Sequence, residues 1–166
     1  MGSKKRNTPF RSKWKPSINT LDIATARVAK LSQDTVAGLQ ASLDRSVQAL
    51  SQPDESARAW LDLRLACIVS RRVERMGVVR GLSAVIEDGY EALESMRVRN
   101  MSSGVWSYSQ PLPRELEAIK EMTRMHAFQL GQLSAGEFER VFLAARSDLA
   151  SLPKISVPVP AEPAAA

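Results

Sequence analysis

Apolar residues recur at intervals of three and four along most of the chain, which is the spacing of one face of an α-helix. This pattern predicts a short leading helix within residues 21–31, longer helices over residues 32–51, 56–76, 78–99 and 113–133, and a last helix over residues 134–149. Only residues 105–108 read as a short extended piece. We therefore expect an all-α fold, a bundle of about four long helices with a short leading helix and disordered tails.

The composition divides the chain into three parts. Residues 1–17 lack a hydrophobic period and contain two prolines, which predicts a basic flexible arm. Residues 18–152 are expected to form a single helical domain. Residues 153–166 are rich in proline and alanine, which predicts a disordered tail.

The segment 56–77 is apolar on nearly every side in its first three turns, which is typical of a helix at the centre of its domain. Gly77 is a suitable residue for the left-handed position after it. Arg64, Arg71 and Arg75 fall on one stripe of this helix, with Arg72 beside them and Arg80 beyond. Two interpretations are open: ion pairs with Glu74 or with acids of the next helix, or a surface that binds anions or nucleic acid.

The net charge of +5 is unevenly distributed. Residues 1–15 contain six cations and no acid, whereas the other 151 residues contain 17 basic and 18 acidic side chains. The six are Lys4, Lys5, Arg6, Arg11, Lys13 and Lys15. This predicts a nearly neutral domain with a cationic arm.

Phe10 and Trp14 are interleaved with these cations. Such a mixture suits a phosphate backbone, where cations release counterions and rings stack on unpaired bases. A solubilising tail whose rings tuck against the domain is nearly as well supported, and an anionic membrane surface or an acidic protein is a further alternative.

Several single residues have structural interpretations that we favour over functional ones. Cys67 lies in the most apolar helix and is expected to be a buried thiol. Gly89 lies in an apolar face, which predicts close approach of a neighbouring helix. Trp106 is expected to close one end of the bundle, with recognition as the alternative. His126 lies in an apolar stripe and is expected to be hydrogen-bonded in the core.

No catalytic, cofactor or metal signature is present in the sequence. The one histidine and one cysteine lie on core faces, and there is no phosphate-binding glycine loop or dinucleotide fingerprint. The glutamates of residues 115–121 and 137–139 are interpreted as solvated surface and helix caps, and those of residues 87–94 as an acidic patch. We therefore expect a protein that is not an enzyme, with no cofactor and no metal.

No apolar run approaches the ~20 residues that span a bilayer, and no apolar segment follows the basic N-terminus as in a secretory signal. A single cysteine also fits a reducing compartment. We expect a cytoplasmic protein with no membrane partner. The oligomeric state does not follow from the sequence.

Three segments, Gly104-Val-Trp106, Met125-His126-Ala-Phe-Gln129-Leu130 and Ser134-Ala-Gly-Glu137-Phe138, resemble those of small proteins on prophages and mobile elements of proteobacteria. Those proteins similarly open with a basic, proline-containing arm before a helical body. The resemblance implies a phage- or plasmid-encoded accessory protein and no catalytic residue. It also implies a structural or interaction role for Trp106 and His126.

Two functions remain. The first is a non-enzymatic accessory protein of a phage or mobile element that binds nucleic acid electrostatically through the arm, with Phe10 and Trp14 stacking and Arg71, Arg72 and Arg75 assisting. The alternative is a protein–protein interaction module, an adaptor or inhibitor of a host or phage protein, that acts through its helical surface.

Overall fold

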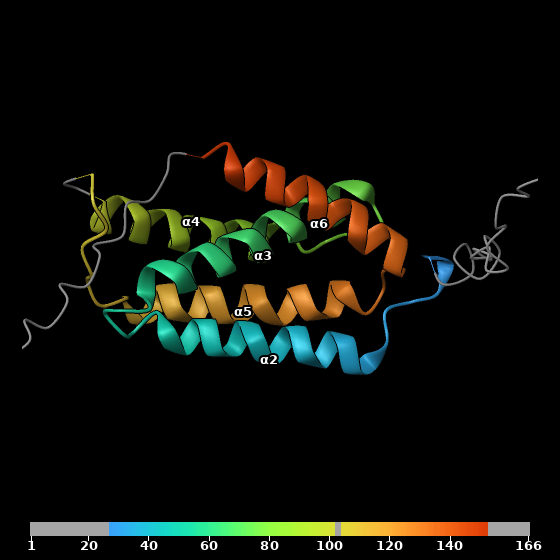
Figure 1. The fold of residues 1–166 in the computed structure, drawn as a ribbon, viewed down its shortest axis with the longest axis horizontal. Helices are drawn as coiled ribbons and strands as arrows, with labels where there is room; N and C mark the ends of the chain where they lie inside the picture. Colours follow the sequence, from blue (N-terminus) through green and yellow to red (C-terminus); the bar gives the residue numbers. More distant parts are fainter. Residues whose placement is uncertain (1–26, 102–103, 153–166) are drawn as a thin grey trace, which may run out of the picture.

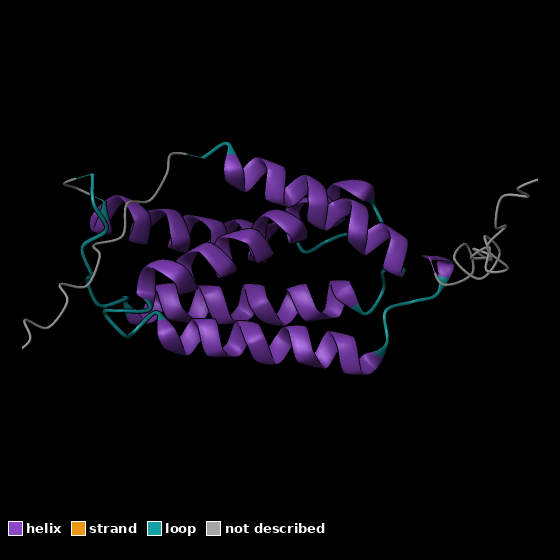
Figure 2. Cartoon of the chain, in the orientation of Figure 1, coloured by secondary structure: helices purple, strands orange, loops and turns teal. Residues whose placement is uncertain are grey.

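The computed structural model describes residues 27–101 and 104–152. Within these ranges the chain forms α-helices joined by loops (Figures 1 and 2). The helices are α2 (Gln33–Ala49), α3 (Ser56–Met76), α4 (Ser83–Asn100), α5 (Pro113–Leu130) and α6 (Ala135–Ala150). The predicted all-α class is confirmed. The arm at 1–17, the tail at 153–166 and most of the predicted leading helix at 21–31 lie outside the described residues.

Four of the helices form an antiparallel ring. α2 packs on α3, α3 on α4, α4 on α5 and α5 back on α2, and consecutive helices run in opposite directions (Figure 1). α6 lies outside this ring against α3, so that α3 packs against each of the other four helices. The prediction that the segment 56–77 is the central helix is confirmed.

The two buried tryptophans anchor one end of the core. The Trp60 ring lies 5.9 Å from the Trp106 ring, centroid to centroid. Trp60 Nε1 donates to the Leu93 carbonyl oxygen at 2.7 Å, and Trp106 Nε1 donates to Ser56 Oγ at 3.0 Å. Both indole N–H groups are therefore satisfied away from water. Trp106 is buried, as expected for a residue that closes this end of the bundle.

A second, smaller core cluster attaches α6. Its buried members are Val69, Val73, Leu130, Leu133, Val141 and Ala145. Only Val141 and Ala145 of α6 itself are buried, while Phe138 and Phe142 are half-buried and stack on each other. α6 therefore rests on α3 through a narrow apolar stripe, and the surfaces beside that stripe stay accessible.

Most helix ends follow the predicted capping chemistry. Ser32 caps α2, and Pro113 is the first residue of α5. Ser134 and Glu137 form the capping box of α6. Gly77 ends α3 in the left-handed conformation, with φ of 75°. The left-handed position predicted for Gly77 is confirmed.

The predicted start of α4 at residue 78 is wrong, since the helix begins at Ser83. Gly81 adopts φ of 91°, which breaks the helical path. The Glu74 carboxylate then accepts hydrogen bonds from the Gly81 and Leu82 backbone N–H groups, at 2.8 and 3.2 Å. An acid from the preceding helix therefore caps α4, and helical periodicity does not reveal such a cap.

The predicted end of α5 is also wrong, whereas α3 begins at residue 56 as predicted but without the expected cap. α5 ends at Leu130 and not at residue 133, because residues 131–133 form a turn. The cap predicted for α3 at Asp54 or Ser56 is absent: Glu55 occupies the cap position without a side-chain hydrogen bond. The Ser56 hydroxyl donates instead to the Pro53 carbonyl oxygen at 3.2 Å.

Close approach of two helices explains Gly89, as predicted. A Cβ atom at position 89 would lie 2.5 Å from Met122 Cβ and 2.7 Å from Met122 Cγ, on α5. Any side chain here would push α4 and α5 apart.

We expect Gly89→Ala to lower the free energy of unfolding by about 1–3 kcal/mol, because overpacking outweighs the gain in helix propensity. The matched control is Gly38→Ala in α2, where a Cβ meets nothing within 4 Å. The control should raise stability by about 1 kcal/mol. Urea unfolding of both variants measures the difference, and stabilisation by Gly89→Ala would contradict the close packing.

Candidate functional site

The first arginine of the predicted stripe, Arg64, is a core residue. It is 4% exposed, and its guanidinium lies 3.9 Å from the Tyr90 ring centroid and 5.8 Å from that of Trp60. Arg64 Nη2 also lies 3.8 Å from Glu94 Oε2. The ring faces and the carboxylate compensate the buried cation in part, while its Nε and Nη1 have no hydrogen-bond partner among the described residues. Arg64 is thus unavailable to a partner.

Arg71 and Arg72 are engaged by acids on the helices that flank α3. Arg71 Nε lies 3.0 Å from Glu87 Oε1 on α4, and its guanidinium lies 4.3 Å from the Tyr90 ring centroid. Arg72 Nη2 lies 2.6 Å from Asp148 Oδ2 on α6. This geometry agrees with the ion-pair interpretation of the stripe. Nucleic-acid contact by Arg71 and Arg72 stays a prediction, and it would compete with these pairs.

Arg75 is different, because it is exposed and has no ion pair within the described part of the chain. It borders a cavity of about 370 Å³ between α3 and α6. The lining residues are Arg72, Arg75, Met76, Arg140, Val141 and Ala144. We call this cavity the α3–α6 groove. It combines three arginines with an apolar wall, and no acid lines it among the described residues.

Sequence reasoning missed Arg140. It lies in the second turn of α6, on the exposed side of that helix, where the periodicity gives no sign of a role. Antiparallel packing of α6 on α3 brings it beside the last turn of α3, which carries Arg75. Only knowledge that these two helices pair could have found it, and the apolar spacing of the sequence does not reveal that pairing.

The chain leading to the arm joins the domain at this same end. The Leu31 N–H donates to the Leu133 carbonyl oxygen at 3.0 Å, and the Ala135 N–H donates to the Ala29 carbonyl oxygen at 2.9 Å. The Arg27 carbonyl oxygen lies 3.0 Å from the place a Cβ of Gly136 would take. The described chain therefore begins beside the first turn of α6, at the right of Figure 1.

We call the exposed cations Arg75, Arg80 and Arg140 the basic end of the bundle. Arg80 lies in the loop between α3 and α4, and its guanidinium packs over Gly77. The eight predicted nucleic-acid-binding residues of the arm lie outside the described residues, and their role stays a prediction. They are Lys4, Lys5, Arg6, Phe10, Arg11, Lys13, Trp14 and Lys15.

The buried histidine and cysteine are not placed for chemistry. His126 Nδ1 lies 2.8 Å from Ser70 Oγ, which confirms a hydrogen-bonded core histidine, and the Ser70 side chain is fully buried away from any substrate. Burial lowers the pKa of His126 to about 4. Cys67 is buried as predicted, and burial raises the pKa of its thiol to about 11. Among the described residues, no group of three His, Cys, Asp or Glu side chains could hold a metal.

Glu115 corrects the prediction of solvated acids on α5. It is 3% exposed and accepts hydrogen bonds from Arg99 Nη1 and Nη2, at 2.8 and 2.7 Å. It also caps α5 by accepting from the Leu112 N–H at 2.8 Å. Burial alone would raise the pKa of Glu115, but these hydrogen bonds outweigh it and leave the pKa lowered. Glu115 is a structural residue that ties α4 to α5.

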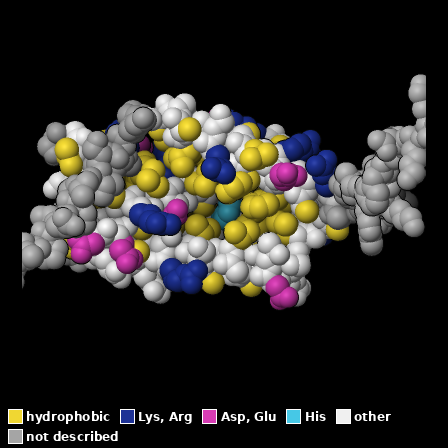
Figure 3. All heavy atoms as spheres, viewed as in Figure 1, with side chains coloured by type: hydrophobic (Ala, Val, Ile, Leu, Met, Phe, Trp, Pro, Cys, Tyr) yellow, Lys and Arg dark blue, Asp and Glu magenta, His cyan; other side chains and the backbone are white. Residues whose placement is uncertain are grey.

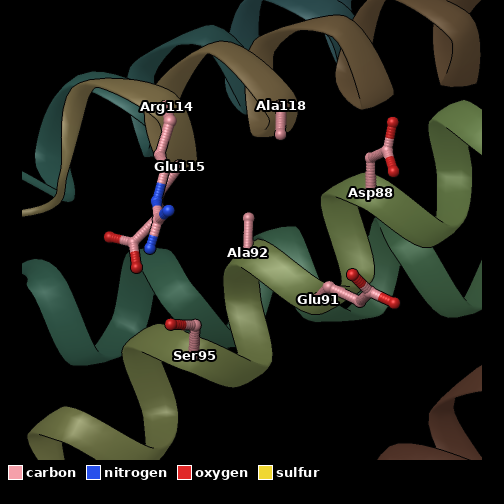
Figure 4. A pocket seen from close by; sticks show the side chains of 7 residues that line it. All are labelled: Asp88, Glu91, Ala92, Ser95, Arg114, Glu115 and Ala118. Carbon is pink, nitrogen blue, oxygen red and sulfur yellow. The ribbon is translucent and has the colours of Figure 1, made fainter.

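A second cavity of about 370 Å³ lies between α4 and α5. Figure 4 shows Asp88 and Glu91 at one end of it and Arg114 with Glu115 at the other, with Ala92 between them. Charges of both signs line this cavity, and Arg99 already engages Glu115. It offers no unpaired cation cluster comparable to the α3–α6 groove.

No known protein family, curated protein or solved structure matches this chain. Within residues 27–101 and 104–152, no helix has the length and apolar character to cross a membrane. The candidate site is therefore argued from the positions and charges of its residues alone.

The buried His126 predicts a pH dependence of stability. Its folded-state pKa of about 4 lies below the ordinary 6.5, so the unfolded chain binds the proton more readily between these values. The contribution of His126 to the free energy of unfolding should therefore be largest above pH 6.5. It should fall as the pH drops toward 4, by at most about 1.4 kcal/mol per pH unit. Urea unfolding at a series of pH values measures this slope.

Carboxylates with a lowered pKa, such as Glu115, reduce stability only when the pH falls below 4.5. Between pH 4.5 and 6.5 the change in stability therefore reports on the histidine. His126→Gln serves as the control and should flatten the slope in that window. Because the chain has one histidine, its NMR signal can be followed directly. Titration of that signal near pH 6.5 in the folded protein would contradict the buried, neutral imidazole.

Proposed function

We propose that the protein is a non-enzymatic accessory protein of a phage or mobile element that binds nucleic acid through its basic N-terminal arm. The observation that carries the proposal is where the described chain begins, ten residues after the predicted arm ends. Residue 27 is tied to the first turn of α6, and the exposed Arg75, Arg80 and Arg140 lie at that same end. A strand held by the arm would thus meet further cations on the domain.

The charges of the chain support the same proposal. Six cations without an acid in residues 1–15 can each replace a counterion on a phosphate backbone, and Phe10 and Trp14 can stack on unpaired bases. Arg64, Arg71 and Arg72 contribute little, because they are buried or ion-paired. The setting on a mobile element rests on the resemblance of the segments around Trp106 and His126.

Neutralising the arm tests the proposal. Replacement of its six lysines and arginines by glutamine should flatten the slope of log K against log salt by about 4 for a single-stranded oligonucleotide, since each lost contact removes about 0.7. Fluorescence anisotropy of labelled oligothymidine between 50 and 200 mM salt measures it. Arg45→Gln with Arg58→Gln is the control, since both arginines are exposed and lack ion pairs within the described residues.

The control should bind like the unaltered protein, because Arg45 and Arg58 lie on the half of the bundle away from residue 27, where the described chain begins. Equal affinity and slope for the arm variant and the unaltered protein would overturn the proposal. So would the absence of binding by both at low salt.

A second candidate, a protein–protein interaction module, is favoured by one observation. Apolar side chains gather in the middle of the face seen in Figure 3, where α3 and α5 lie between α2 and α6. Half-buried hydrophobic residues on these helices include Leu39, Leu65, Ile68, Phe138 and Phe142. Apolar faces of this kind are common at protein interfaces. This candidate predicts no salt-dependent affinity for nucleic acid.

A further inference from the structure

We infer that the α3–α6 groove is a binding site for one nucleotide of a single-stranded nucleic acid. In this site Arg75 and Arg140 hold the phosphodiester, and the apolar wall takes the sugar or the face of the base. This inference rests on the proposed function and deepens it, because it assigns a site on the folded domain in addition to the arm.

The cations come from two different helices. Arg75 lies in the last turn of α3 and Arg140 in the second turn of α6, and both line the same cavity of about 370 Å³. Guanidinium groups that converge from two rigid elements match phosphate oxygens with fixed geometry. Among the described residues neither arginine has an ion pair that an arriving phosphate would need to break.

Two neighbouring acids, Asp148 and Glu137, are already engaged. Asp148 Oδ2 accepts from Arg72 Nε and Nη2, at 2.9 and 2.6 Å, which neutralises the third arginine of the groove. Glu137, one turn before Arg140, accepts from the Ser134 N–H and hydroxyl, both at 2.8 Å, in the cap of α6. Arg140 also lies near enough to Glu137 to help lower the pKa of that carboxyl. The groove therefore retains two arginines without an ion pair among the described residues, which suits a single backbone phosphate better than a run of them.

The wall of the groove selects for a single strand. Met76, Val141 and Ala144 supply apolar surface directly beside the arginines. Met76 is exposed, and its thioether is polarisable, so it can adapt to the face of a base. Only an unpaired nucleotide presents a free base face together with its phosphate, because duplex bases are stacked inside the helix.

The position of the groove also fits the arm. Residue 27 is tied to Gly136 in the first turn of α6, and Arg140 lies about one turn further along the same helix. The groove thus lies on the same helix against which the described chain begins, ten residues after the end of the arm.

The test uses the full chain with Arg75→Gln and Arg140→Gln combined. Loss of the one phosphate contact that the two arginines share should weaken binding of single-stranded oligothymidine about fivefold at 0.1 M salt and flatten the salt slope by about 0.7. The matched control is again Arg45→Gln with Arg58→Gln, which removes the same charge from the other half of the bundle. A duplex of equal length should bind the groove variant and the unaltered protein with affinities within about threefold of each other.

Each outcome decides the inference. Weaker single-strand binding by the groove variant alone, with duplex affinity retained, supports it. Equal weakening by the groove variant and the control, or equal loss of duplex and single-strand affinity, overturns it. If the arm variant loses affinity while the groove variant binds normally, the groove inference fails and the proposed function stands. If the unaltered protein binds no nucleic acid, both fail.

Discussion

The burial of α3 by four other helices is the constraint on which the rest of the structure depends. A helix of 21 residues surrounded in this way has to satisfy its own arginines inside the fold. Arg64 does so on the ring of Tyr90 and the carboxylate of Glu94. Arg71 and Arg72 do so with acids of α4 and α6. Arg75, past these packed turns, is exposed and has no ion pair among the described residues, so it is available to a partner.

The peripheral position of α6 has the opposite consequence. Because α6 buries only Val141 and Ala145, much of its surface is available for contacts. The start of α6 anchors the incoming chain through the Leu31 and Ala135 backbone hydrogen bonds. The first turns of α6, the least enclosed helix, thus lie beside both the start of the described chain and the α3–α6 groove. The enclosed helices form the stable core.

The sequence predicted the helices well because their apolar spacing is local information. It placed the central helix, the caps at Ser32 and Ser134, the tight contact at Gly89 and the buried His126, each of which follows from near neighbours. The start of α4 and the burial of Glu115 were wrong, because Glu74 and Arg99 reach them from another helix. The α3–α6 groove was invisible for the same reason, since Arg140 meets Arg75 only after packing.

NMR chemical-shift mapping of the full chain with single-stranded oligothymidine tests most directly the claim that nucleic acid binds at the end where the arm joins the bundle. The account predicts that the largest changes on the helical domain occur at backbone amides around Arg27, Arg75, Arg80 and Arg140. Changes confined to the α4–α5 cavity around Glu91 and Ala118, or no change at saturating oligonucleotide, would contradict it.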